Sequence, residues 1–156
     1  MTKRRIPAIM TVIVLVLMLL LPARAVEMET VWVICRPGYS VNIRSKASSR
    51  SEIVGYADPG DDFQTDGQKK AGFLHVYAPI DAMDGWIAMG YIVNDEPQLV
   101  NEYRTIKANG KVKVRNKVNG KRIGWLKPGE QVLVYYIAEW CVTSAGYVRW
   151  EYIGEE

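Results

Sequence analysis

Apolar and polar positions alternate in short runs along the chain from residue 30 onward, and this period of two predicts β-strands. Gly, Pro, Asn and Asp separate the runs and indicate turns. Because no convincing helical period lies between them, the pattern predicts an all-β fold whose strands are too short for a large sandwich. The expected strands are TVWVIC (30–35), SVNIR (40–44), FLHVYA (73–78), GWIAMGYIV (85–93), KVKVR (111–115) and QVLVYYI (131–137).

Three sequence blocks recur in the same order, which indicates an internal repeat. The repeat divides the chain into a unit at residues 30–93 and a unit at residues 103–154. The polar segment 94–102 is the expected linker, in which Pro97 stiffens the connection without joining it to a sheet. The matching blocks are VNIR (41–44) with VKVR (112–115), GYADPGDDF (55–63) with GWLKPGEQV (124–132), and GWIAMGYI (85–92) with GYVRWEYI (146–153).

The order of motifs within each unit follows a known small-domain pattern. A strand ends in an apolar-x-apolar-Arg step, a Gly-x-x-x-Pro-Gly turn follows, and a late Gly-aromatic-aliphatic strand closes on Tyr-Ile. In these features each unit resembles a bacterial SH3-type domain, and the resemblance covers nearly all of the chain after residue 25. It implies two small SH3-like β-barrels in tandem, in an exported module that binds cell-wall components or peptides.

The first 25 residues have the pattern of a signal peptide. A basic start (residues 3–5) precedes an apolar run (residues 12–21), and PARA (residues 22–25) presents small side chains to a signal peptidase. We expect cleavage after Ala25 and a protein that is secreted or associated with the cell envelope. The alternative is an uncleaved anchor, although the apolar segment is shorter than the roughly 20 residues that span a bilayer.

Removal of this leader changes the charge balance of the chain. The full sequence has 20 Lys and Arg against 17 Asp and Glu, but four of the basic residues lie within residues 1–25. The remaining chain is close to neutral, so nucleic acid is not an expected partner.

The remaining charge is unevenly distributed between the two units. Residues 26–102 carry 6 basic and 12 acidic side chains, whereas residues 103–156 carry 10 and 5. Most of the basic side chains of the second unit lie in one segment, residues 111–127. This basic segment could face an anionic wall polymer or a membrane surface, dock on an acidic partner or the first unit, or remain a solvated face. Its cations are Lys111, Lys113, Arg115, Lys117, Lys121, Arg122 and Lys127, with no carboxylate between them.

Amphipathic aromatic residues are the candidate ligand-binding groups. The chain has 5 Trp and 9 Tyr but 2 Phe, and such rings can pack on one side while they meet solvent or ligand on the other. The alternative is that these rings cover a small barrel. The candidates pair between the repeats as Tyr56 with Trp125, Trp86 with Tyr147, and Tyr91 with Tyr152.

The cysteines and the histidine give little support to catalysis. Cys35 and Cys141 could form one disulfide in an exported protein, or they could be two separate buried thiols. His75 is the only histidine, and alternation places it opposite Leu74 and Val76 on the surface of its strand. No catalytic residue is expected, because no motif orients a base for a nucleophile. No metal or other cofactor is expected either, because clustered ligand spacing is absent from the sequence.

These patterns together predict an exported, non-catalytic binding protein. Its expected partner is peptidoglycan, through peptide or glycan, another envelope component, or an envelope protein. Membrane contact is expected only through the leader, if the leader is not cleaved. One alternative is a structural protein whose basic second unit docks a protein partner or an anionic polymer. Another is a wall hydrolase with an unrecognised site.

Overall fold

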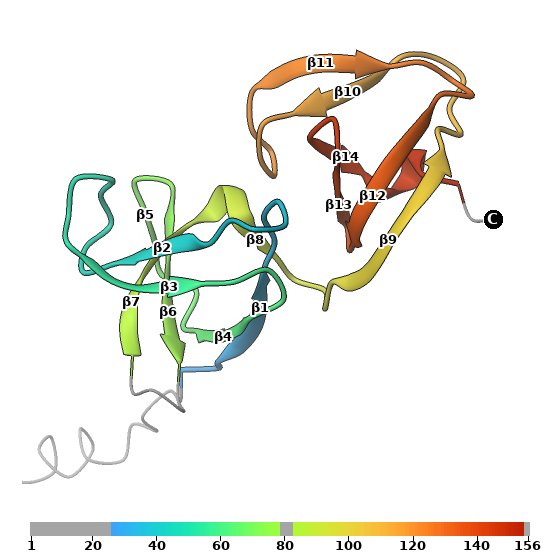
Figure 1. The fold of residues 1–156 in the computed structure, drawn as a ribbon. Coiled ribbons are helices and arrows are strands. Elements are labelled where there is room, and N and C mark those ends of the chain that lie inside the picture. The colour runs from blue at the N-terminus through green and yellow to red at the C-terminus, as the bar shows by residue number, and fades with distance from the viewer. Residues whose placement is uncertain (1–25, 79–82, 155–156) are drawn as a thin grey trace, which may run out of the picture.

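The chain folds into two all-β units that lie side by side in the computed structural model, which describes residues 26–78 and 83–154 (Figure 1). The predicted all-β class and the tandem arrangement are confirmed. The expected signal peptide lies outside the described residues. Within the described part of the chain, no helix is long and apolar enough to cross a membrane.

The first unit is an antiparallel sheet with the strand order β3-β2-β7-β6-β4-β1-β8, and β5 pairs with β6. A short 3₁₀ helix, η1 (Met89–Tyr91), connects β7 to β8. The strands are β1 (Glu29–Val33), β2 (Val41–Arg44), β3 (Ile53–Ala57), β4 (Asp62–Thr65), β5 (Lys69–Lys70), β6 (Phe73–Ala78), β7 (Met83–Ala88) and β8 (Ile92–Val93).

The second unit has the strand order β11-β10-β14-β13-β12-β9. The 3₁₀ helix η2 (Trp150–Tyr152) follows β14, as η1 follows β7 in the first unit. The strands are β9 (Gln98–Thr105), β10 (Val112–Arg115), β11 (Arg122–Leu126), β12 (Gln131–Ile137), β13 (Trp140–Thr143) and β14 (Tyr147–Arg149).

The expected linker is shorter in the structure than in the sequence pattern. Residues 98–102 belong to β9, which pairs with β12 from Gln98 opposite Ile137 to Thr105 opposite Gln131. The sequence pattern did not predict β9, because its first residues are largely polar. A strand at a sheet edge can pair through its backbone without a continuous apolar face. The connection between the units is therefore confined to residues 94–97.

The turns containing Pro59 and Pro128 share one backbone feature in the two units. Gly60 and Gly129 have φ values of +97° and +78°, in the left-handed region that glycine adopts without steric cost. Each turn is closed by a carboxylate three residues beyond its start. The Asp61 side chain accepts the Asp58 N–H at 2.8 Å, and Glu130 accepts the Lys127 N–H at 2.8 Å.

Each unit has its own apolar core, and each core contains one cysteine. Cys35 is buried with Val41 and Ile43 in the first core, and Cys141 with Val114 and Val134 in the second. Both are free thiols. Of the two alternatives, the structure has two separate buried thiols and no disulfide, because alternation directs each cysteine into the core of its own unit rather than toward the other.

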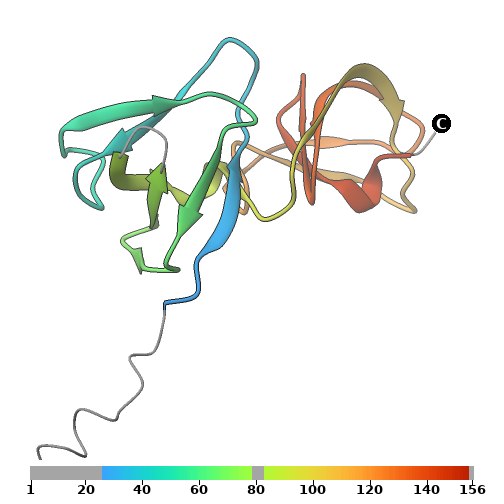
Figure 2. The ribbon, with the colours of Figure 1, turned by 90° about the horizontal axis from the view of Figure 1, so that it is seen from below.

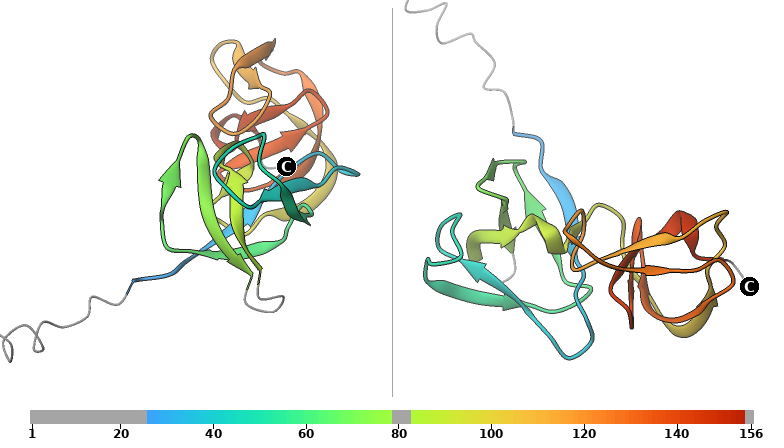
Figure 3. Two further views of the ribbon diagram at one scale, coloured as in Figure 1. Left: turned by 90° about the vertical axis from the view of Figure 1, so that its left-hand side faces the viewer. Right: turned by 90° about the horizontal axis from the view of Figure 1, so that it is seen from above.

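A third apolar cluster, which we call the seam, joins the two units. Ile34 and Val93 of the first unit are buried with Val118, Trp140 and Val142 of the second. The loop between β10 and β11 reaches the first unit (Figure 3), where Val118 N–H donates to the carbonyl of Gly90 at 2.9 Å. The units are thus coupled by packing as well as by the single connection visible between them (Figure 2).

Candidate functional site

Backbone hydrogen bonds establish which residues are equivalent in the two units. Ile34 N–H donates to the carbonyl of Tyr91 at 2.9 Å, and Lys107 N–H donates to the carbonyl of Tyr152 at 3.0 Å. Ile34 and Lys107 therefore occupy one structural position, as do Tyr91 and Tyr152. By the same register Val93 corresponds to Gly154.

The second unit does not have the apolar pair that Ile34 and Val93 form in the first unit. Lys107 replaces Ile34, and its side chain lies directly over Gly154, at the position of Val93. In the first unit Ile34 and Val93 are buried against the second unit.

A groove of about 470 Å³ lies on the first unit next to the seam, and we call it the seam groove. Tyr39, Asn42 and Arg44 line it from the first unit, together with Tyr91 at its base. The second unit contributes Asn116 and Tyr147, so both units form its walls.

A second groove, also of about 470 Å³, lies on the second unit. Its lining residues occupy the positions that line the seam groove in the first unit, so the repeat has produced the same concavity twice. The residues at the positions of Ser40, Asn42, Arg44, Ala88 and Tyr91 are Lys111, Lys113, Arg115, Arg149 and Tyr152.

The arginine at the end of each VNIR-like strand anchors the following loop. Arg44 Nη1 donates to the carbonyl of Ser51 at 2.7 Å, and Arg115 Nη1 donates to the carbonyl of Gly120 at 2.6 Å. The predicted motif thus has a structural role in both units. Arg115 belongs to the predicted basic patch, but part of its guanidinium is used within its own unit.

The loops that these arginines hold are also equivalent. Ser45 N–H donates to the carbonyl of Glu52 at 2.9 Å, and Asn116 N–H donates to that of Lys121 at 3.0 Å. Two residues beyond each donor, the first loop carries Ala47 and the second carries Val118, which is buried in the seam.

Glycine is required where the late strand of each unit crosses the strand that ends in arginine. A Cβ atom on Gly85 would lie 2.5 Å from Ile43 Cγ2 and 3.1 Å from the Arg44 carbonyl oxygen. A Cβ atom on Gly146 would lie 2.7 Å from the Arg115 carbonyl oxygen. This close approach is the physical reason why both copies of the third block begin with glycine.

The six candidate aromatic residues fall into three structural settings. Tyr91 lines the seam groove and Tyr152 lines the second groove. The side chain of Glu151 raises the pKa of Tyr152 through a hydrogen bond and its charge.

Two of the other aromatic candidates are committed to packing. Tyr147 is 3% exposed, and its hydroxyl donates to the carbonyl of Ile34 at 3.3 Å across the seam. Burial raises the pKa of this hydroxyl. Trp86 packs against His75, with 4.8 Å between the ring centroids.

The remaining pair, Tyr56 and Trp125, is exposed on β3 and β11 but lines neither groove. The guanidinium of Arg122 lies 4.8 Å from the centre of the Trp125 ring.

The predicted cations also separate by location. Lys111, Lys113 and Arg115 line the second groove. The aliphatic part of Lys117 packs over Gly90 of the first unit. The exposed Lys121 and Lys127 lie outside the groove.

Sequence reasoning missed several groove residues. Trp140 lies outside the three repeated blocks, and Tyr39 precedes the first of them. Arg149 lies inside the block GYVRWEYI, opposite Ala88 in the first copy. A comparison of the blocks column by column would have shown this gain of charge.

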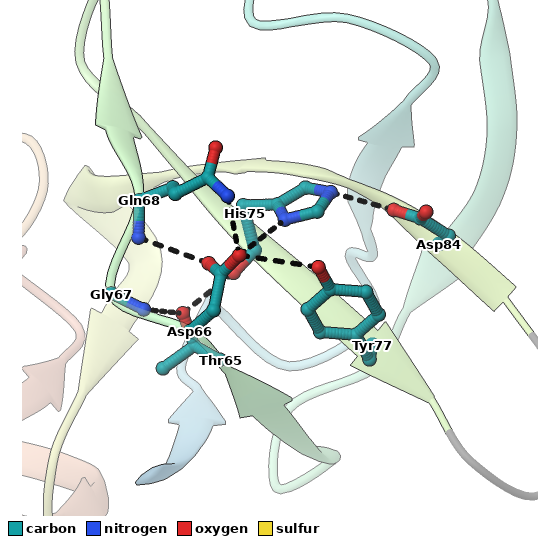
Figure 4. Close-up of polar contacts among 7 residues, drawn as sticks. All are labelled: Thr65, Asp66, Gly67, Gln68, His75, Tyr77 and Asp84. Atoms are coloured by element: carbon teal, nitrogen blue, oxygen red, sulfur yellow. Dashed lines mark hydrogen bonds and ion pairs between the residues drawn. The ribbon is translucent and has the colours of Figure 1, made fainter. Parts of the chain in front are cut away.

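His75 is not the exposed strand residue that the pattern predicted. Its side chain is 12% exposed and is bonded on both nitrogens, to Asp66 at 3.3 Å and to Asp84 at 2.6 Å (Figure 4). Alternation is still obeyed, because Leu74 and Val76 are buried on the other face. The segment that follows β4 covers the His75 side chain, and strand periodicity does not predict how that segment folds.

Asp66 is the centre of this cluster. Its carboxylate accepts hydrogen bonds from the Gln68 backbone at 3.0 Å, the Gln68 side chain at 2.6 Å and the Tyr77 hydroxyl at 3.2 Å. Burial raises the pKa of Asp66, but the hydrogen bonds from Gln68, His75 and Tyr77 outweigh it and leave the pKa below its usual value. The cluster ties the segment between β4 and β6 to strands β6 and β7 (Figure 4).

Cys35 is a buried thiol that lines the seam groove. Burial, together with the charges of Asp58 and Asp61, raises its pKa to about 11. Its Sγ–H donates to the carbonyl of Tyr39 at 3.0 Å. In residues 26–78 and 83–154, no group of three or more His, Cys, Asp or Glu side chains could hold a metal ion.

Comparisons with known proteins give distant structural likenesses. No family model and no curated protein sequence matches the chain. Two solved structures are similar, NlpC1 and NlpC2 from Trichomonas vaginalis, each 13% identical in sequence. The likeness covers 83% of this chain but 46% and 49% of those chains, with TM-scores of 0.35 and 0.33. The chain therefore spans less than half the length of the solved proteins it resembles.

Proposed function

We propose that the protein is an exported, non-catalytic binding protein with two SH3-type units, and that it recognises a peptide or glycan of the cell envelope in the seam groove. The observation that carries this proposal is that both units form the groove. Residues from η1, β2 and the β10–β11 loop converge on one concavity. Concave sites between structural units are a common location for ligand binding.

The groove combines aromatic and polar side chains with two cations, Arg36 and Arg44, and this chemistry suits a polar ligand. Tyr39 is 69% exposed at its rim, and a tyrosine ring offers an apolar face together with a polar hydroxyl. Asn42 supplies both a donor and an acceptor, which suits the amide groups of a peptide or an acetylated sugar. A short peptide or glycan segment therefore fits the groove better than a purely apolar ligand.

The chemistry of the thiol supports binding rather than catalysis. A thiol whose pKa is about 11 is protonated at neutral pH, so Cys35 is a poor nucleophile as it stands. His75 does not line the groove, and its ring nitrogens are engaged by Asp66 and Asp84. His75 is therefore not placed to act as a base for Cys35.

Retention on purified bacterial wall sacculi tests the proposal. The full chain is exported from a bacterial host, purified, and mixed with sacculi over a range of salt concentrations. Tyr39→Ala is expected to lower retention by about fivefold or more, because an anchoring aromatic contact is worth over about 1 kcal/mol. Tyr103→Ala is the matched control, since Tyr103 is 65% exposed and lies outside both grooves.

Two results would contradict the proposal. The first is that the unchanged protein is not retained at any salt concentration. The second is that Tyr39→Ala and Tyr103→Ala reduce retention equally, which would mean that binding does not involve the seam groove. Release of soluble wall fragments during the same incubation would show catalysis and would overturn the non-catalytic assignment.

A further inference from the structure

The second groove differs from the seam groove in charge, although the two occupy equivalent positions. Three neutral residues of the first unit, Ser40, Asn42 and Ala88, are replaced by Lys111, Lys113 and Arg149. The second groove is therefore lined by four cations and one carboxylate, whereas the seam groove is lined by two cations, Arg36 and Arg44, and no carboxylate. The two grooves therefore occupy equivalent positions in their units, but the second groove carries the higher positive charge.

The two lysines are available to a ligand. Lys111 and Lys113 are exposed, and within residues 26–78 and 83–154 neither forms an ion pair with a carboxylate. Lys111 directly precedes β10 and Lys113 lies within it, and side chains two residues apart along an extended chain point to the same side. Their ammonium groups can therefore reach one ligand together.

Arg149 is held in position above the groove. Its guanidinium lies 5.5 Å from the centre of the Trp140 ring, and its Nε is 3.9 Å from Glu151 Oε1. Stacking on a buried tryptophan restricts the guanidinium plane, so less freedom is lost when it binds an anion. Glu151 is the acidic side chain among the lining residues, and four cations outnumber it.

We propose that the second groove is a separate site for a multivalent oxyanion, a phosphate or carboxylate polymer, whose anionic groups are bound by Lys111, Lys113 and Arg149. Arg115 contributes a further positive charge while its Nη1 holds the loop. The buried Trp140 and the half-buried Tyr152 supply an apolar floor for the carbon chain between the anionic groups. This site is distinct from the seam groove, so its test does not depend on ligand binding there.

Calorimetric titration with defined polyanions tests the site. The probes are sodium tripolyphosphate and a short poly-L-glutamate, each titrated into the full chain at low salt. The variant Lys111→Gln with Lys113→Gln removes two charges from the groove. The matched control, Lys121→Gln with Lys127→Gln, removes two charges from the same basic segment outside the groove.

The groove variant is expected to bind at least about tenfold more weakly, because each hydrogen bond to a charged group contributes about 1.5 kcal/mol or more. The control variant is expected to lose no more than about twofold, since exposed charges at a distance are largely screened. Tripolyphosphate binding without poly-L-glutamate binding would identify phosphate as the anionic group, and the reverse result would identify carboxylate. Thermal unfolding midpoints are measured for both variants, and both are expected to match the unchanged protein because all four side chains are exposed.

Three results would overturn the proposal. The first is that the unchanged protein binds neither probe. The second is an equal loss in the two variants, which would show a diffuse field over the whole segment instead of a site. The third is unchanged binding in the groove variant.

Discussion

The loop residue Val118 offers a sharp test of the coupling between the two units. Val118 is buried in the seam, whereas its equivalent Ala47 is half-buried and does not belong to the seam cluster. Val118→Asp would lose the burial of the valine side chain, about 1.5 kcal/mol or more. It would also place a carboxylate among Ile34, Val93 and Trp140, which costs several kcal/mol when the charge has no partner.

The expected result is separation of the units without unfolding. The second core is built from other side chains, including Val112, Val114 and Leu126, so it is retained when Val118 changes. Backbone NMR relaxation gives the rotational correlation time of each unit. We expect one common value for the unchanged chain and two shorter values for Val118→Asp.

The control is Ala47→Asp, which introduces the same charge at the equivalent position of the first unit. It is expected to leave the common correlation time unchanged. The reasoning is refuted if Val118→Asp still tumbles as one body, or if Ala47→Asp separates the units to the same extent. A loss of dispersed amide signals from the second unit would instead show that Val118 supports folding of that unit.

Three further predictions concern single positions. Gly85→Ala is expected to lower the free energy of unfolding by about 2 kcal/mol through overpacking against β2, whereas Gly124→Ala, where a new Cβ meets no atom closer than 4.0 Å, should change it far less in urea titrations. Asp66→Asn is expected to destabilise the protein at neutral pH. Because the folded pKa of Asp66 is lowered, this stability is present above the unfolded pKa of about 4 and is lost as pH falls through the folded pKa; a difference from the unchanged protein that persists in acid would contradict the assignment. Cys35 and Cys141 should resist alkylation at pH 8 in the native protein, because burial raises their pKa values to about 11 and about 12. In denaturant each should take one label without prior reduction, because both are free thiols. A linked peptide in non-reducing mass mapping would show a disulfide instead.

The fold was largely predictable because strand alternation and turn chemistry are local signals. The alternation that predicted the strands VNIR and VKVR agrees with the structure, in which Val41, Ile43, Val112 and Val114 are buried. The Pro-Gly turns required positive φ at Gly60 and Gly129, and both have it. β9 escaped prediction because its pairing with β12 is made by backbone groups, which leave no apolar pattern in the sequence.

The site was less predictable because it depends on contacts between distant segments. The repeat correctly related Tyr91 to Tyr152, and both line a groove, but it could not show that Tyr147 would be buried against Ile34 of the other unit. The basic segment was visible from composition alone. Its division into groove-lining and outlying cations required the register of β10 and β11.

The seam joins two different faces of the repeated unit. The first unit contributes the face with Ile34 and Val93, and the second contributes the loop and strands around Val118. A head-to-tail contact of this kind can repeat without limit and produce filaments, because each added unit presents the same face again. Here the equivalent face of the second unit carries Lys107 folded over Gly154 in place of the apolar pair. Another copy of the protein would meet a cation there instead of an apolar pair, so we expect this face not to extend the head-to-tail contact.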